Sequence, residues 1–475
     1  MSNYMLKFKF GLKSRLGLIP GTSRIEAQDI ELKKEYEEFL RYEESSEPQR
    51  FVELEELVTS QDFKDRKKYI QSQRFKDSDA YSRLMDYKAM KKSSLFKAYF
   101  RFVSSKFFPD FQKFDNSEEV KKLEAAGEDK NDEYSTLRKS PGIKAYYKLS
   151  RSKDLEAFRK LHDSPELKKF NELENYVNSD EFKSTKKHLE SRDKFKKTPE
   201  YKQLTDYQEL KKSKKLKWYY KCKESGKFNE LSKWKLVFSD DFAGQELDRN
   251  KWLTSFYWGK KLLKKNYSLA SDNHFYTDGK NHEVANSMMK LHTRKEQITG
   301  QAWDPELGFY PKNFEYTSGL INTGESFRQQ YGAFEAKVRM HRSTSVYHAF
   351  WMLSDKMVPH IDIFRFSGKK KRRIELNSFW EVKGKRNEIR RNSDNVGGID
   401  FSKGFFIYRF EWYPDRMVWK INNTVVKTSH EGIPDEPMYI LFSSGVESNP
   451  SGNGLPTTMD IDWVRCFSHD GDKKS

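Results

Sequence analysis

Two hydrophobic patterns divide the chain near Ser232–Trp234. Before this point apolar residues recur at helical spacing, as at Phe170 and Leu173. After it they alternate with polar residues, as at Phe406 and Tyr408, which is the period of a strand with one buried face. The patterns predict a multidomain α plus β protein, with an N-terminal array of short helices and a C-terminal antiparallel β-sandwich of the jelly-roll type.

The helical part is built from a duplicated unit. The segment Ser60–Phe100 recurs as Ser179–Tyr220, at an offset of 119 residues that becomes 120 after one insertion. We place the two copies at about residues 45–107 and 164–228, with a partial copy at about 117–150. Because short helices are unstable alone, the repeats must stack on their neighbours.

Three residues mark helix starts in the second copy. Ser164 and Thr198 are followed by Pro-Glu, and Ser179 is followed by Asp-Glu. A Ser or Thr side chain accepts a hydrogen bond from the first helical turn, Pro loses no bond there, and an acidic residue favours the positive end of the helix dipole. The aromatic residues between these caps favour a buried core over the alternative, a nucleic-acid-binding stripe.

We therefore divide the chain into an N-terminal arm at 1–30, a helical-repeat domain at 31–232 and a β domain at 233–475. Within the β domain, Asn422-Asn423 separates two alternating segments. Asn tolerates the positive φ angles of a two-residue hairpin turn, so we predict a hairpin there.

Composition narrows the class of protein. The net charge is +18, and the two cysteines exclude a disulfide scaffold. No run approaches the ~18 apolar residues of a membrane span, and the N-terminus lacks the apolar stretch of a signal peptide. We expect a cytoplasmic protein, or one carried in a larger assembly such as a phage particle, with no membrane partner, no metal and no cofactor.

Six segments of the β domain, taken in order, resemble glycoside hydrolase family 16, the laminarinase-like enzymes. The resemblance implies a concanavalin A-like jelly roll in which the first and last strands pair and a concave sheet holds a glycan groove. It also implies groove positions for Trp351, for Trp258 and, on the strand after the catalytic one, for Glu375. The segments are Trp234–Trp252, Tyr316–Thr323, Gln330–Met340, His348–Leu353, the strands around Phe406–Asn423, and Met459–Phe467.

The stretch Val358–Phe366 matches the catalytic strand of that family, which reads Glu-Ile-Asp-Ile-x-Glu. Retaining hydrolysis needs two carboxyl groups ~5–5.5 Å apart, and a β-bulge brings positions i and i+5 to one face of the strand. Here the two glutamate positions are His360 and Arg365, and only the middle acid, Asp362, remains. We expect the family's chemistry to be lost, with Glu375 as a remote candidate for a replacement nucleophile.

A basic stretch follows this strand. Residues 365–391 contain 11 Lys or Arg and 3 Asp or Glu. The stretch is either a solvated loop or an anion-binding rim beside the groove. The candidate anion-binding residues are Lys369, Lys370, Lys371, Arg372, Arg373, Arg390 and Arg391.

Three functions remain open. The first is an inactive family-16-like protein, a binding or structural module on a helical-repeat arm, whose ligand would include a neutral glycan. The second is an adaptor or assembly component that binds a polyanion, either nucleic acid or an acidic glycan, or a protein partner of the arm. The third is an active glycan hydrolase with rewired residues.

Overall fold

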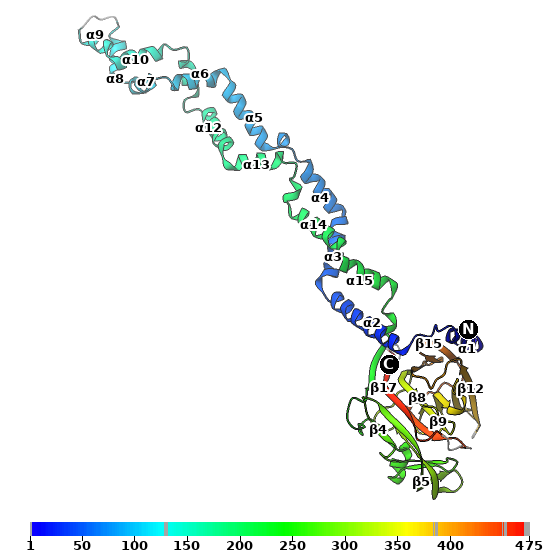
Figure 1. Ribbon diagram of the computed structural model, residues 1–475. Helices are drawn as coiled ribbons and strands as arrows, with labels where there is room; N and C mark the ends of the chain where they lie inside the picture. The colour runs from blue at the N-terminus through cyan, green and yellow to red at the C-terminus, as the bar shows by residue number, and fades with distance from the viewer. Residues whose placement is uncertain are drawn as a thin grey trace. The chain divides into compact units, whose positions relative to one another are not determined.

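The computed structural model describes residues 2–127, 132–382, 384, 388–448, 450 and 454–469. The chain forms two compact units: Met1–Arg41 with Tyr219–Ser475, here the β unit, and Tyr42–Trp218, here the helical unit (Figure 1). These boundaries differ from the predicted ones, because the first 41 residues group with the β-sandwich and do not form a separate arm. Within the described residues, no helix has the length and apolarity needed to cross a bilayer.

Capped short helices make up the helical unit. The predicted caps are confirmed: the side chains of Ser164, Ser179 and Thr198 each accept a hydrogen bond from a backbone N–H of the first turn. The helices are α3 (Ser46–Thr59), α4 (Gln61–Ser72), η1 (Phe75–Asp77), α5 (Asp79–Lys92), α6 (Ser94–Val103), α7 (Phe108–Phe114), α8 (Glu118–Ala125), α9 (Asp132–Lys139), α10 (Pro141–Ser150), α11 (Leu155–Leu161), α12 (Pro165–Asn178), α13 (Asp180–Glu190), η2 (Phe195–Lys197) and α14 (Pro199–Lys212), and α15 (Lys214–Ser225) crosses into the β unit.

The two copies of the repeat pack against each other. Helix α3 contacts α14 and α5 contacts α12, so each helix meets the non-equivalent helix of the other copy (Figure 1). Equivalent hydrogen bonds join both pairs: the Tyr207 hydroxyl donates to Glu55 (2.9 Å), and the Tyr87 hydroxyl donates to Glu174 (2.7 Å). Phe170 is buried in this contact. The duplication therefore produces an approximate two-fold relation between the copies, with aromatic residues in the core as predicted.

Two antiparallel sheets form the sandwich of the β unit, as predicted. The larger sheet has the order β15-β14-β13-β8-β17-β5-β6-β3, with β1, β2 and β4 at its margins, and the smaller has the order β12-β11-β10-β9-β16-β7. The strands are β1 (Trp234–Asp240), β2 (Tyr267–Leu269), β3 (His274–Tyr276), β4 (His282–Val284), β5 (Met289–Asp304), β6 (Gly308–Ser318), β7 (Leu320–Asn322), β8 (Gly332–Met340), β9 (Val346–Leu353), β10 (His360–Ser367), β11 (Arg373–Glu381), β12 (Ile389–Gly397), β13 (Phe405–Trp412), β14 (Met417–Ile421), β15 (Thr424–Ser429), β16 (Tyr439–Val446) and β17 (Thr457–His469).

Alternating side chains from both sheets fill the core. Phe334 from the larger sheet and Phe364 from the smaller one are fully buried in the same cluster. The first and last strands pair, β1 with β17, which confirms the expectation from the family resemblance. Asn422 and Asn423 have φ angles of 46° and 59° and connect β14 to β15, so the predicted hairpin is also confirmed.

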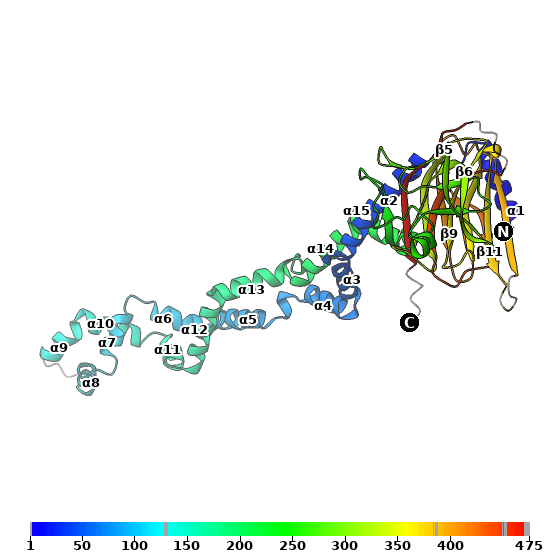
Figure 2. The ribbon, with the colours of Figure 1, turned by 90° about the horizontal axis from the view of Figure 1, so that it is seen from below.

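The N-terminal segment completes this sandwich. Helix α1 (Asn3–Arg15) packs on β12 and β15, the edge strands of the two sheets, and Phe10 lies in the core. Figure 2 shows α1 against the side of the sandwich. Helix α2 (Thr22–Glu43) then places Ile25 against Ile407 and Trp463. Covering an edge strand protects its unpaired backbone groups, which is the physical reason that these residues belong with the β unit.

Candidate functional site

A β-bulge in β10 sets the geometry of the candidate site. The register of β10 against β9 shifts between Asp362 and Phe364, so one extra residue lies in β10. Ile363 and Phe364 both enter the core, while His360, Asp362 and Arg365 lie on the opposite face of the strand. The predicted bulge is confirmed, and it places these three side chains on one surface.

Asp362 is a structural acid in this arrangement. His360 Nε2 lies 2.8 Å from its Oδ1, and Asn377 Nδ2 donates to its Oδ2 at 2.7 Å. The side chain is buried, and burial alone would raise its pKa. The nearby His360 and the hydrogen bonds from His360 and Asn377 outweigh that effect and hold the pKa of Asp362 below its ordinary value. Both carboxylate oxygens are therefore occupied.

Arg365 is the residue that the family resemblance assigns to the acid/base position. Its guanidinium carbon lies 3.8 Å from the centre of the Tyr347 ring. Burial opposes its charge, but Tyr347, Asp362 and Glu447 hold its pKa above the ordinary value for arginine. Arg365 therefore stays charged and cannot donate or accept a proton near neutral pH.

Glu375 lies beside this site on β11. It is the direct cross-strand partner of Arg365, and its side chain is half-buried. It forms no ion pair with another described residue. The sequence suggested Glu375 as a remote candidate for a replacement nucleophile. The register places it opposite Arg365, whereas Phe379 lies opposite His360.

Trp351 lies on β9, the strand paired with β10, and contacts the site through its ring. Its ring stacks on His360, with centroids 4.8 Å apart and planes 26° apart, and its Nε1 donates to Ser443 Oγ at 3.1 Å. Only 7% of Trp351 is exposed. The expectation that Trp351 offers a stacking face to a ligand is therefore not met in this structure, because His360 covers the ring.

Trp258 packs against the aromatic cluster that contains Trp351. It also lines a cavity whose lining does not include Trp351. This cavity has a volume of about 270 Å³, and Trp303 and Phe309 also line it. Trp303 and Phe309 are direct partners across the β5–β6 hairpin. No motif in the sequence singles out either residue.

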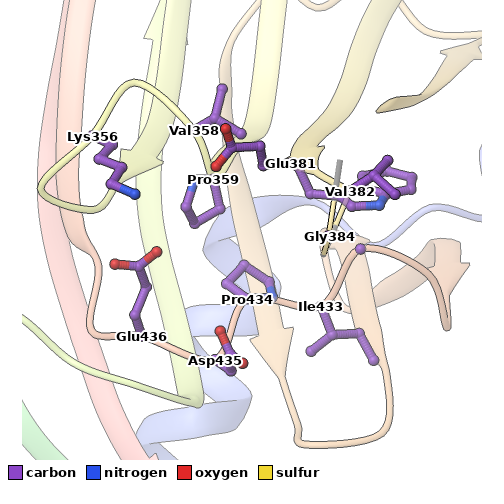
Figure 3. A pocket seen from close by; sticks show the side chains of 12 residues that line it. Lys356, Val358, Pro359, Glu381, Val382, Gly384, Ile433, Pro434, Asp435 and Glu436 are labelled. Carbon is purple, nitrogen blue, oxygen red and sulfur yellow. The ribbon is translucent and has the colours of Figure 1, made fainter. Parts of the chain in front are cut away.

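A larger cavity of about 690 Å³ is lined in part by Val358 and Pro359, which directly precede β10 in the sequence (Figure 3). Glu381, Asp435 and Glu436 give it an acidic lining, with Lys356 as the one cation among the described lining residues. These residues come from three segments far apart in the chain, so no sequence motif identified them. The described residues contain no group of three or more metal-ligand side chains.

The basic stretch 365–391 does not form one surface. Lys369 and Lys370 form a 3-10 turn, η4 (Gly368–Lys370), at one end of β11, and Arg391 pairs with Phe379 near the other end. Several of these cations have local partners, such as Lys371 with Asp400 at 3.1 Å. The predicted rim also included the positions 383 and 385–387, which lie outside the described residues. Of the remaining candidates, Arg372 and Arg373 follow η4 at the start of β11, and Arg390 lies beside Arg391 on β12.

The family model that matches this chain covers residues of the β unit. Residues 269–465 match the family model described as glycosyl hydrolases family 16. The endo-1,3-1,4-β-glycanase ExsH of Rhizobium meliloti (strain 1021) is 25% identical over 249 residues, which are 50% of this chain and 52% of that protein. The glucan endo-1,3-β-glucosidase A1 of Niallia circulans is 24% identical over 279 residues, 49% of this chain and 37% of that protein. The chain thus spans about half or less of the length of these two relatives.

Among solved structures, the catalytic domain of an endo-1,3-β-glucanase (laminarinase) from Thermotoga petrophila RKU-1 is 22% identical. That likeness covers 50% of this chain and 98% of the other, with a TM-score of 0.41. The matched residues of the family model lie within the unit that holds the two sheets. The C-terminal part of this chain, residues 269–465, is therefore a domain of glycosyl hydrolase family 16.

Proposed function

We propose that the sandwich is a glycan-binding module that lacks the hydrolytic chemistry of its family. The observation that carries this proposal is the set of side chains at the bulge: His360, Asp362 and Arg365. Double displacement needs a nucleophile and an acid/base, both carboxyl groups, on one face of the strand. Here that face of β10 has one carboxylate, and His360 and Asn377 occupy both of its oxygens.

The same surface offers groups that suit sugar rings. The Phe379 ring lies edge-on to His360, with centroids 5.2 Å apart, and the Arg391 guanidinium lies 5.8 Å from the Phe379 ring centre. Arg365 and Glu375 add a donor and an acceptor of hydrogen bonds to the same face. Because the named relatives are glycanases and glucosidases of β-glucans, β-1,3- and mixed β-1,3-1,4-glucans are the first ligands to test.

We expect the purified protein to bind these glucans without cleaving them. Affinity electrophoresis in glucan-containing gels should show retarded migration, and a reducing-sugar assay should show no product. Arg365→Ala removes charged hydrogen bonds and should weaken binding by about tenfold or more. Arg416→Ala is the matched control, because Arg416 pairs with Asp415 on a turn outside this surface.

Two results would count against this proposal. One is sustained release of reducing sugar that Glu375→Gln abolishes, since this would indicate an active hydrolase with rewired residues. The other is unaltered migration of the wild-type protein with every glucan tested.

A second function, polyanion binding, is favoured by a cavity in the helical unit. This cavity, of about 620 Å³, is lined by Arg138, Lys144, Lys148 and Arg151, with Glu124 as the one acid among its described lining residues. Lys144 and Lys148 lie four residues apart on one face of α10, and Arg151 is the C-cap of the helix, three residues further on. None of the four cations forms an ion pair with another described residue, although Arg138 donates hydrogen bonds to the backbone carbonyls of Leu123 and Gly127. We expect their positive charge to attract phosphate or sulfate groups.

Salt dependence tests this second function. With labelled single-stranded DNA, four phosphate contacts predict that the logarithm of affinity falls with the logarithm of salt concentration with a slope of roughly −3. The double variant Lys144→Glu and Lys148→Glu should bind more weakly and with a shallower slope. Lys168→Glu with Lys169→Glu makes the same charge change on the exposed surface of α12 and should leave binding unchanged. A sulfated glycan tested in parallel separates nucleic acid from acidic glycan, and no binding of either contradicts the function.

A further inference from the structure

The outward face of α1 is apolar. Tyr4, Met5, Phe8 and Leu12 on the helix, and Leu16 at its C-cap, are between 47% and 76% exposed. Their spacing of three to four residues aligns them in one stripe along the helix. Soluble proteins rarely leave a contiguous apolar surface of this kind uncovered unless it contacts a partner.

The fold holds this stripe outward. Phe10, on the opposite face of α1, is fully buried in the sandwich core. The Asn3 side chain exchanges two hydrogen bonds with the backbone of Thr428, each 2.9 Å long, and Lys7 forms an ion pair with Asp394. The helix therefore cannot rotate to bury its apolar stripe without losing Phe10 from the core.

Cations accompany the stripe. The first 25 residues contain five Lys or Arg and no Asp or Glu. Lys9, Lys13 and Arg15 are exposed on α1, next to the apolar side chains. An apolar helix face with basic residues beside it is the pattern of helices that lie in the interface of an anionic bilayer.

We propose that α1 binds the surface of an anionic lipid bilayer, with Phe8, Leu12 and their neighbours in the acyl–headgroup boundary. Lys9, Lys13 and Arg15 would contact lipid phosphates, where each cation adds attraction. A second copy of the chain is the poorer occupant, because a two-fold contact through this stripe would bring the same cations together. This proposal replaces the expectation of no membrane partner, which rested on the lack of a membrane span.

Sedimentation with vesicles tests the proposal on the full chain. We expect the protein to bind vesicles of phosphatidylcholine with phosphatidylglycerol, and to bind phosphatidylcholine alone far less. The double variant Phe8→Ser and Leu12→Ser should lower the bound fraction by about tenfold or more, because it removes two large apolar side chains from the contact. Leu307→Ser is the matched control, since Leu307 is an isolated exposed residue at the β5–β6 turn.

Three outcomes would overturn the proposal. The first is no binding to either vesicle. The second is equal binding to both vesicles at low and high salt, which would exclude a role for the cations. The third is a wild-type dimer in sedimentation velocity that Phe8→Ser with Leu12→Ser converts to monomer, which would assign the stripe to a second copy. The double variant must show the wild-type tryptophan fluorescence, so that loss of binding is not loss of fold.

Discussion

We expect Phe10→Ala to lower the free energy of unfolding of the β unit by about 3–5 kcal/mol, the usual cost of deleting a buried phenylalanine ring. Phe10 is fully buried in the sandwich core, although it lies more than 200 residues before the first strand that surrounds it. Its loss leaves a cavity and loosens α1 from the edge strands β12 and β15.

Phe8→Ala is the matched control on the same helix. Phe8 is exposed, so its removal should change stability by no more than about 0.5 kcal/mol. Nine of the ten tryptophans lie in the β unit, so tryptophan fluorescence during guanidinium unfolding reports on that unit. Equal effects of Phe8→Ala and Phe10→Ala would show that α1 is not part of the sandwich core.

The second large effect is expected at Asp362. We expect Asp362→Ala to destabilise the β unit by about 3–5 kcal/mol. Removing one partner of a buried, charge-assisted pair leaves the other partner buried without its hydrogen bond. His360 and Asn377 would both lose their acceptor. Glu375→Ala, on the neighbouring strand, removes a half-buried carboxylate without a described ion pair and should have little effect on unfolding.

The pH dependence of unfolding is a second test of the role of Asp362, because the direction of the stability change with pH can be predicted. The pKa of Asp362 is lower in the folded protein than its ordinary value of 3.8. The unfolded chain therefore binds its proton at a higher pH than the folded chain does. The stabilisation from Asp362 is present above pH 3.8 and is lost as the pH falls through the folded pKa. Asp362→Ala should remove this acid-range dependence, and an unchanged pH profile would exclude Asp362 as its source.

The prediction that His360 and Arg365 replace two glutamates could be made from the sequence, because the pattern behind it is local. His360, Asp362 and Arg365 lie within six residues, and the family pattern assigns each to a position. The sequence could not show how far Trp351 is buried. That burial depends on His360 stacking from the next strand and on Ser443 from β16, and such contacts require the register of three strands.

The basic stretch 365–391 is a case in which residues close together in the sequence are separated in the fold. Along the sequence, the cations from Arg365 to Arg391 form one dense group. In the fold, β11 and β12 are antiparallel, so Arg373 and Arg391 lie at opposite ends of the pair. A strand rises by about 3.3 Å per residue, so separation along β11 disperses charges that are neighbours in the chain. The close spacing of these cations in the sequence therefore does not mean that they lie on a single anion-binding rim.

The sequence by itself determined the features that depend on neighbouring residues. These are the helix starts at capping residues, the turn at Asn422-Asn423, the strand alternation, the duplication, and the presence of His360 and Arg365 where the family resemblance expects two glutamates. Only the tertiary structure decided which helices of the two copies pair, and that α1 closes the sandwich with its apolar stripe outward. The physical reason is that caps and periodicity act within a few residues, whereas the choice of the buried face of α1 depends on edge strands hundreds of residues away.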